Sequence, residues 1–490
     1  MRRLDGVLFA FACVGALGAS LAQGQQQGPA LPQSQQQAPD QSSQPIPAYH
    51  SPLASAADSG EVDSQQGMPD DRSLSGAQNL SPLLLPTRSY WQPGIDVFAT
   101  VDSNPSGIGS NTNWSGGAVV SGRIDVHRIS GVSAMDASYM GGASFSANNS
   151  FGTGVVQALG FSDRISFHRS NLSFFDQFTY LPGSSFGFGG LGGLPGGSLP
   201  GTGSNGLGPT FGPGGTVLIG EGQTLENSFV TQFDTSLTRR ASLTLVGGYY
   251  FSHYFNSDLF NSGNPNFRLG YNYQLGHKDT IAAFYTFGGY GYGSSSTQSM
   301  HTNTAEFSYG RVVTQRISFQ IAGGPQWISS QIPLTANGQT TTVTSTTQLN
   351  YTLHASLAWL VGRSRVGISY YRGADAGSGV FAGSIGNSFT GSLTRAVSRT
   401  FSSGISGGYS RNTGVVTNTA GALVNQTYNS WYAGATLSHP IGTSLGLTLS
   451  YWFQHQNSST ASCVGPSCQA SILTNVFSVG LGWHTRPLAF

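Results

Sequence analysis

The chain has few charged residues, few cysteines and, beyond its N-terminus, no long apolar run. Only 8% of its 490 residues are charged, against roughly 25% in ordinary globular proteins, which disfavours a large soluble domain. The formal net charge of +1 argues against a nucleic-acid-binding protein, because such a protein would carry a basic patch. No internal stretch approaches the roughly 20 apolar residues of a membrane-spanning helix. The mean hydropathy is nevertheless only -0.11, because Gly, Ser, Thr, Asn and Gln supply polarity without charge.

The cysteines number three, and Cys13 falls inside the N-terminal apolar segment. It lacks the leucine three residues earlier that a lipoprotein signal would have. Cys463 and Cys468 lie in a polar segment between two strand-like runs. In an exported chain this pair predicts a disulfide that closes a short loop, worth about 2 kcal/mol in the chain-entropy model. The loop offers too few further ligands for a metal, and we expect no cofactor.

The first 22 residues have the organisation of a secretory signal peptide. Arg2 and Arg3 form a basic start, and residues 7–21 form the apolar core. A small-x-small cleavage site ends at Ala22. A membrane anchor is the alternative, but the apolar core is shorter than the roughly 20 residues that a span needs. We therefore predict export, with the mature chain starting near residue 23.

Residues 23–88 differ in composition from the rest of the chain. Gln and Pro dominate the first part, and a Ser-, Ala- and Pro-containing stretch with several carboxylates follows. Such a segment cannot bury enough apolar surface to offset the entropy of ordering it. We predict a disordered periplasmic tether, with binding to peptidoglycan or another envelope protein as the alternative. The carboxylates are Asp58, Glu61, Asp63, Asp70 and Asp71.

From about residue 95 onward, strand-length segments alternate apolar and polar residues. Residues 348–359 show this best, since Leu349, Tyr351 and Leu353 alternate with Asn350 and Thr352. A period of two places the two sets on opposite faces of a strand. Short basic or polar turns alternate with longer Gly-, Ser- and Asn-rich connections, including one predicted over residues 331–346 and another over 256–266. The pattern predicts an even number of antiparallel strands.

In these features residues 89–490 resemble a Gram-negative outer-membrane β-barrel of porin-like size. The export signal and the aromatic terminal residue Phe490 belong to the same resemblance. It implies an all-β, antiparallel, up-and-down transmembrane barrel of about 16–18 strands, with short turns in the periplasm and long loops outside the cell. It also implies contact with outer-membrane lipid and recognition of Phe490 by the barrel-assembly machinery. Arg486 and Pro487 interrupt the last strand-like run, so the match at the C-terminus is incomplete.

The alternation also assigns side chains to the lipid or to the lumen. Tryptophans should gather in two interfacial bands: Trp91, Trp359 and Trp483 near the periplasm, and Trp114, Trp327 and Trp431 near the cell exterior. The phase of Trp452 points it inward instead. The predicted lipid-facing sets are Ala118, Val120, Ile124 and Val126; Leu243, Leu245, Tyr249 and Phe251; Phe267, Leu269, Tyr271 and Tyr273; and Leu445, Leu447, Leu449, Tyr451 and Phe453.

Inward-facing polar residues are the candidates for a pore lining. In a channel, rings of charge set ion preference; alternatively these side chains only bond one another and water. Because charges are so few, the lumen should be weakly ion-selective and suited to sugars or other small neutral polar solutes. The candidates are Arg123, Asp125, His127, Gln232, Asp234, Glu306, His354 and Arg372.

Residues 182–221 form the longest predicted loop, and 16 of its 40 residues are glycine. Glycine without charge cannot form a stable fold unaided. The loop could fold inward as a constriction or plug, extend as a surface-contact loop, or stay disordered. Its candidate constriction residues are Phe186, Phe188, Leu191, Leu194 and Phe211.

Motifs for catalysis are weak. Two G-x-G-x-x-G matches, at 187–192 and 201–206, lack the helix that a dinucleotide site needs. A G-x-S-x-G match puts Ser406 in mid-strand and not at a strand-to-helix turn. We therefore predict no enzyme, and a passive or gated channel for small polar solutes. A structural, adhesive or polysaccharide-export barrel is the alternative, and a hydrolase at the barrel rim a weaker one.

Overall fold

The computed structural model describes eleven segments of the chain, and every structural statement below concerns them. They are residues 89–104, 114–147, 153–181, 223–255, 261–292, 299–336, 339–375, 383–398, 400–415, 427–458 and 471–490. The predicted signal peptide, the tether, the five constriction-loop candidates and the Cys463–Cys468 disulfide all lie outside these residues and stay predictions.

Almost all of the described chain is β-strand, as the alternating pattern predicts. The strands are β1 (Tyr90–Asp102), β2 (Ser115–Ser130), β3 (Ser133–Ser146), β4 (Gly154–Ser166), β5 (Ser170–Leu181), β6 (Thr224–Ser236), β7 (Ala241–Tyr254), β8 (Ser262–Gln274), β9 (Asp279–Tyr292), β10 (Ser299–Thr314), β11 (Ile317–Ala336), β12 (Gln339–Val361), β13 (Ser364–Asp375), β14 (Ser384–Ala396), β15 (Ser402–Gly414), β16 (Thr427–Ile441), β17 (Leu445–Ser458), β18 (Ser471–His484) and β19 (Leu488–Ala489).

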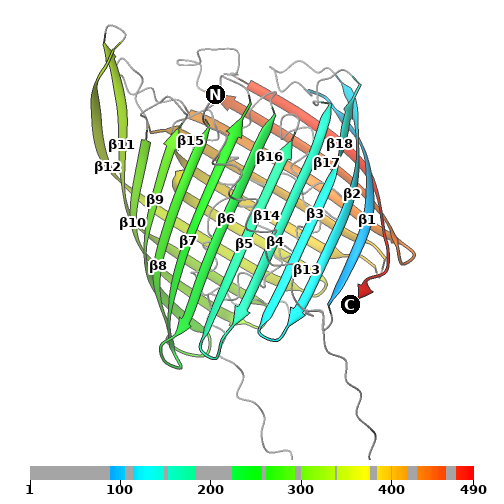
Figure 1. Cartoon of the computed structure of the whole chain (residues 1–490), viewed down its shortest axis with the longest axis horizontal. Coiled ribbons are helices and arrows are strands. Elements are labelled where there is room, and N and C mark those ends of the chain that lie inside the picture. The colour runs from blue at the N-terminus through cyan, green and yellow to red at the C-terminus, as the bar shows by residue number, and fades with distance from the viewer. Residues whose placement is uncertain are drawn as a thin grey trace, which may run out of the picture. The chain divides into compact units, whose positions relative to one another are not determined.

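The strands close into a barrel. Each of β1 to β17 pairs antiparallel with the next strand in chain order, and β1 also pairs with both β18 and β19. β18 and β19 pair with successive parts of β1, so together they count as one strand of the wall. The barrel therefore has 18 strands. Figure 1 shows the tilted strands running around it. The prediction of an all-β, up-and-down barrel is confirmed, and of the predicted 16–18 strands the higher number is correct.

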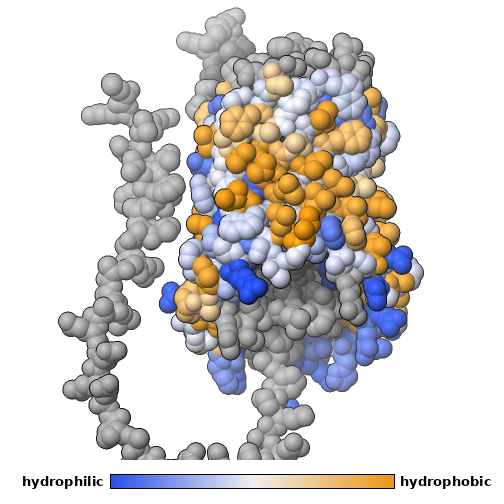
Figure 2. All heavy atoms as spheres, turned by 90° about the vertical axis from the view of Figure 1, so that its right-hand side faces the viewer, coloured by the Kyte–Doolittle hydropathy of each residue, from blue (hydrophilic) through white to orange (hydrophobic). Residues whose placement is uncertain are grey.

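The two faces of the wall differ as the alternation predicts. In β1, Val97 and Val101 are exposed on the outer face, while Asp96 and Thr100 are buried on the inner, lumenal face. Figure 2 shows part of the outer wall as an apolar band with hydrophilic side chains gathered below it. An apolar band outside and a polar wall inside are the two surfaces of a transmembrane barrel.

The tryptophans confirm the depth of the band. Trp91 and Trp483 lie at the end of the barrel that carries the short turns, where Trp91 pairs with Leu488 and Trp483 with Ile95. Trp431 lies in the opposite half, across from Tyr409 and His455. Trp114, Trp327 and Trp359 occupy their predicted ends as well, and these six are exposed outward. Two rings of exposed tryptophan are what interfacial anchoring requires.

The outer band gives a matched test of membrane depth. We expect Val97→Arg to lower the free energy of unfolding by about 2–4 kcal/mol and Val101→Arg by only about 0–1 kcal/mol, since the cost of a lipid-facing cation falls towards the interface. Val97 lies at the middle of β1 and Val101 near its end, and their exposures are 44% and 45%. Urea unfolding in lipid vesicles measures both. Equal costs would contradict the assigned depth.

The seam between β1 and β18 joins the two ends of the barrel sequence. At the short-turn end, Gln92 Nε2 lies 2.6 Å from His484 Nδ1, between residues 392 positions apart. At the opposite end, the Asn475 backbone N–H donates to Ser103 Oγ at 2.8 Å, and Asn104 Nδ2 donates to the Leu473 carbonyl at 3.2 Å. Side chains thus hold this pairing in register at both ends.

Two connections are shorter than predicted. The segment 331–346 is mostly strand, because β11 and β12 stay paired up to Ala336 and Gln339. The two strands extend beyond their neighbours in Figure 1. β8 likewise begins at Ser262 and not after residue 266. Residues 339–347 are mostly threonine, and residues 262–266 are Ser, Gly, Asn and Pro, so neither segment has an apolar period that alternation could reveal.

Candidate functional site

The lumenal wall is lined mainly by polar side chains. Along β10, Thr302, Thr304, Glu306 and Ser308 face inward and are buried, whereas Phe307 between them is exposed outward. Small hydroxyl and amide side chains from neighbouring strands bond across this face. Gln326 Nε2, for example, donates to Thr304 Oγ1 at 3.2 Å. The lumenal wall is therefore the candidate functional surface.

A network around Glu306 is the most connected charged part of this wall. Glu306 Oε2 lies 3.6 Å from Arg268 Nη2 on β8, and Glu306 Oε1 lies 3.3 Å from His354 Nε2 on β12. The Thr352 hydroxyl also donates to Oε1. Arg268 Nε donates to Thr286 Oγ1 at 2.7 Å. The carboxylate thus joins side chains from strands on both sides of β10, in what we call the Glu306 network (Arg268, Glu306, Thr352 and His354).

The charged side chains of the network are buried, so their contacts contribute to the stability of the barrel. Glu306 is 2% exposed, Arg268 6% and His354 8%. A buried charge is tolerated only when an opposite charge and hydrogen bonds compensate it. The Arg268 guanidinium also lies 4.9 Å from the centre of the Phe284 ring, which adds a cation–π contact. The network therefore links β8, β10 and β12 on the lumenal side, and Arg268 also contacts β9 through Thr286 and Phe284.

Gly324 of β11 permits this cross-link. It pairs with Thr352, and a Cβ built on it would lie 1.9 Å from the Ala305 carbonyl oxygen and 3.0 Å from the Glu306 Cα. No side chain fits at that distance, so the backbones of β10 and β11 can approach here only at a glycine. Glu306 can then reach past β11 to Thr352 and His354 on β12.

A second charged group lies at the short-turn half of β1 to β3. Arg123 Nε is 3.0 Å from Asp125 Oδ2, and Arg123 Nη1 is 3.5 Å from Asp96 Oδ2. His127 Nδ1 lies 2.6 Å from Asp136 Oδ1. All five side chains lie on the lumenal face. Three carboxylates around one arginine and one histidine make this part of the wall the more acidic one.

A third group lies on β6 and β7. Gln232 Nε2 donates to Asp234 Oδ2 at 2.7 Å, and the Thr244 hydroxyl donates to Asp234 Oδ1. All three side chains are buried on the lumenal face. The carboxylate is therefore held by neutral donors.

The structure corrects the position of Arg372. The sequence prediction puts this residue in the pore lining, but β13 places it on the outer face, opposite Leu353. Its guanidinium lies 4.2 Å from the centre of the exposed Tyr351 ring, and Nη1 donates to Asn387 Oδ1 at 2.6 Å. Nη2 donates to Asn350 Oδ1 at 3.2 Å. The face of the Tyr351 ring and two amide oxygens therefore stabilise the Arg372 cation on the outer face, near the strand end.

The other seven pore-lining candidates do lie on the lumenal face. Their role in a pore stays a prediction. Sequence reasoning missed Arg268, which falls in the inward phase between two lipid-facing residues, Phe267 and Leu269. It also missed Asp96 and Asp136, which lie in the inward phase of β1 and β3. In each case the alternation alone was a sufficient signal.

The strand ends at the long-loop side fold onto the lumenal face. Ala374 at the end of β13 and Ile385 at the start of β14 pack with Tyr290, Met300 and Ile328, which face inward from β9 to β11. The Tyr290 hydroxyl donates to the Ala374 carbonyl at 3.4 Å. Ordinary strand neighbours do not meet in this way, because β12 lies between β11 and β13. The wall itself therefore narrows this mouth of the barrel.

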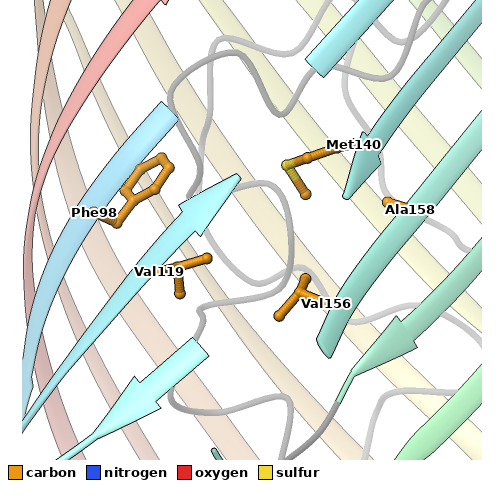
Figure 3. Packing of buried hydrophobic residues seen from close by; sticks show 5 residues of the cluster. All are labelled: Phe98, Val119, Met140, Val156 and Ala158. Carbon is orange, nitrogen blue, oxygen red and sulfur yellow. The ribbon is translucent and has the colours of Figure 1, made fainter. Parts of the chain in front are cut away.

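An apolar patch interrupts the polar wall on β1 to β4. It consists of Phe98, Val119, Met140, Val156 and Ala158, all buried on the lumenal face. Figure 3 shows the five side chains projecting from the strands towards a common space. The patch is therefore a buried apolar area within an otherwise polar lumenal wall.

In the described part of the chain, no group of three or more His, Cys, Asp or Glu side chains is arranged to hold a metal ion. Ser406, the serine of the G-x-S-x-G match, lies on the lumenal face of β15 opposite Ser392 and Gly434. A hydrolase at the lipid-facing rim would need this serine on the outer face. Among the same residues, no helix is long and apolar enough to cross a membrane.

Comparison with known proteins finds similarity to solved structures but not to a family model or a curated sequence. Among similar solved structures, Pseudomonas aeruginosa OccK2 (OpdF) is 9% identical, with a TM-score of 0.40, and covers 81% of this chain and 98% of its own. Acinetobacter baumannii OccAB3 is 10% identical, with a TM-score of 0.39, and the match covers 81% of this chain and 99% of OccAB3. At this level of likeness, function has to follow from the residues of this chain.

Proposed function

We propose that this barrel is a passive channel for small polar solutes in the outer membrane of a Gram-negative cell. The observation that carries the proposal is the polar lumenal wall of a closed 18-strand barrel. In barrels of about 16–18 strands the wall side chains do not fill the interior, so an aqueous path can run along it. In this orientation the short turns face the periplasm and the long loops face outward.

Neutral or zwitterionic solutes suit this lumen best. Most of the charged side chains described above lie in groups where carboxylates meet arginine or histidine within 3.6 Å, as in the Glu306 network, whereas Asp234 is held by neutral donors. Paired charges leave little net potential, whereas a strongly selective pore needs an unbalanced ring. The remaining lining of Ser, Thr, Asn and Gln can exchange hydrogen bonds with the hydroxyl groups of a sugar.

Planar-bilayer recording of the purified barrel tests the proposal. We expect stable open steps, and a reversal potential close to zero in a KCl gradient, because cations and anions should pass about equally. The control is Glu306→Gln, which removes one carboxylate and should move the reversal potential towards anions. Absence of any steps in the native protein and in a variant lacking residues 182–221 would rule the channel out.

A structural, adhesive or polysaccharide-export barrel is the second candidate, and the narrowed mouth favours it. If Ala374, Ile385 and the residues they contact close the lumen, the native barrel should not conduct. Steps that appear only after deletion of residues 182–221 would indicate a gated barrel, and steps in the native protein a channel. Recognition of Phe490 by the barrel-assembly machinery, and contact of the outer band with lipid, belong to either candidate.

A further inference from the structure

The short turns of the barrel form a ring of positive charge. Exposed arginine or lysine side chains stand in or beside these turns, whereas the turns contain no acidic residue. The nearest carboxylate among the described residues, Asp279, is already bonded to Tyr309 at 2.6 Å and lies 3.6 Å from Arg311. We call this ring the basic rim. Its members are Arg128, Arg169, Arg239, Arg240, Lys278, Arg316, Arg363, Arg395 and Arg486.

The rim cations have no acidic partner in the described barrel. Of the ion pairs between described residues, none includes a member of the basic rim. Arg239, Arg240 and Lys278 stand within turns, beyond the ends of β6 to β9 and therefore beyond the apolar band. Side chains placed there face water at the mouth of the barrel. They are available to an anionic partner that approaches from the same side.

The sequence that precedes β1 contains an anionic segment of this kind. Residues 58–71 contain five carboxylates and no lysine or arginine. The barrel begins at the same end as the basic rim, because Tyr90 pairs with His127 of β2 and with Ala489. Residues 72–88 connect the two. We propose that this acidic segment, residues 58–71, docks on the basic rim of its own barrel.

The length of the connection makes the contact feasible. As a flexible chain, residues 72–88 have an end-to-end distance of roughly 20–25 Å, and their full extension is about 60 Å. The turn between β6 and β7, with Arg239 and Arg240, lies five to six strands from β1, which is roughly 25 Å along the rim. The turn with Lys278 lies seven to eight strands from β1, which is roughly 36 Å and still within the full extension. Tethering on this scale gives an effective concentration in the millimolar range. Single exposed ion pairs are weak, so the contact depends on several pairs and on ionic strength.

Lys278 is the only lysine in the chain, which allows a specific test. Zero-length carbodiimide coupling joins a lysine amine to a carboxylate only when they touch. We expect peptides that link Lys278 to residues 58–71 of the full mature protein in micelles at about 0.1 M salt. Their yield should fall at least about fivefold at about 1 M salt, where the screening length shrinks from about 10 Å to 3 Å.

Two variants separate docking from mere proximity. Arg239→Gln with Arg240→Gln leaves every reacting group in place, but should reduce the linked peptides several-fold because it removes the neighbouring rim charge. Lys278→Arg with Arg411→Lys moves the amine to the opposite end of the barrel, where Arg411 is exposed, and should give no link to residues 58–71. Equal yields in the first variant, or a link in the second, would overturn the proposal.

Lipid phosphates are the competing occupant of the basic rim. The same coupling in bilayers containing phosphatidylglycerol distinguishes the two. If the acidic segment is the partner, the yield should stay within about twofold of that in neutral bilayers at equal ionic strength. Loss of the linked peptides only in the anionic bilayers would assign the rim to lipid headgroups and overturn the proposal.

Discussion

Glu306→Ala is expected to lower the free energy of unfolding of the barrel by about 3–5 kcal/mol, the cost of removing one partner from a buried ion pair. The change deprives Arg268 and His354 of the carboxylate that lies within 3.6 Å and 3.3 Å of them. It also removes the acceptor of the Thr352 hydroxyl. Urea unfolding in lipid vesicles measures the loss, and heat-modifiable migration on a gel reports whether the barrel still forms.

Matched variants separate the charge from the packing. Glu306→Gln keeps an acceptor for Thr352 but no charge, and should cost less than Glu306→Ala. The double variant Glu306→Leu with Arg268→Met removes both charges and should recover part of the loss, because a buried pair replaced by apolar groups is often neutral or stabilising. A double variant as unstable as Glu306→Ala would mean that packing, and not the uncompensated charge, sets the cost.

Trp452→Ala should have an effect of similar size, about 3–5 kcal/mol, as for other buried tryptophans truncated to alanine. Trp452 is 1% exposed on the lumenal face of β17 and clusters with Tyr432 and Val476. It has room because Gly434 lies opposite it on β16. A Cβ on Gly434 would lie 2.0 Å from the indole ring. Urea unfolding of the variant in vesicles checks the size of the loss.

The contact between Gly434 and the indole can be tested by a double-mutant cycle. Gly434→Ala should cost about 1–3 kcal/mol in native protein, the usual cost of overpacking, and almost nothing when Trp452 is already alanine. Gly391→Ala is the matched control, since a Cβ there meets no atom within 4 Å. Additive costs would show that the ring is not what excludes a side chain at Gly434.

Much of the fold was predictable from the sequence, because a two-residue period reports directly which face of a strand is buried. The alternation gave the lipid-facing residues of β17 and the inward direction of Trp452. It failed for Thr-rich residues 339–347, where Val343 is the single apolar residue. There the β-branched residues were the available signal. The short polar and basic turns predicted the strand reversals to within a few residues.

The candidate site was predictable only in part. The inward phase identified Glu306 and His354 as lumenal, but not as partners, because β11 separates their strands. Which residues meet across strands depends on register, and register depends on turn geometry that a sequence does not display. Arg372 shows that polarity alone does not identify a lumenal residue. At a strand end, an aromatic ring and amides can hold a cation on the outer face.

The seam between β1 and β18 has a consequence for how the barrel is made. Every other pairing joins strands that follow each other in the chain, and such hairpins can form one after another during assembly in the membrane. The seam needs the first and last strands together, so both keep unpaired edges until the barrel closes. Unpaired edges cannot be left in lipid and invite aggregation in water. Closing this single long-range pairing should therefore be the slow and chaperone-dependent step of biogenesis.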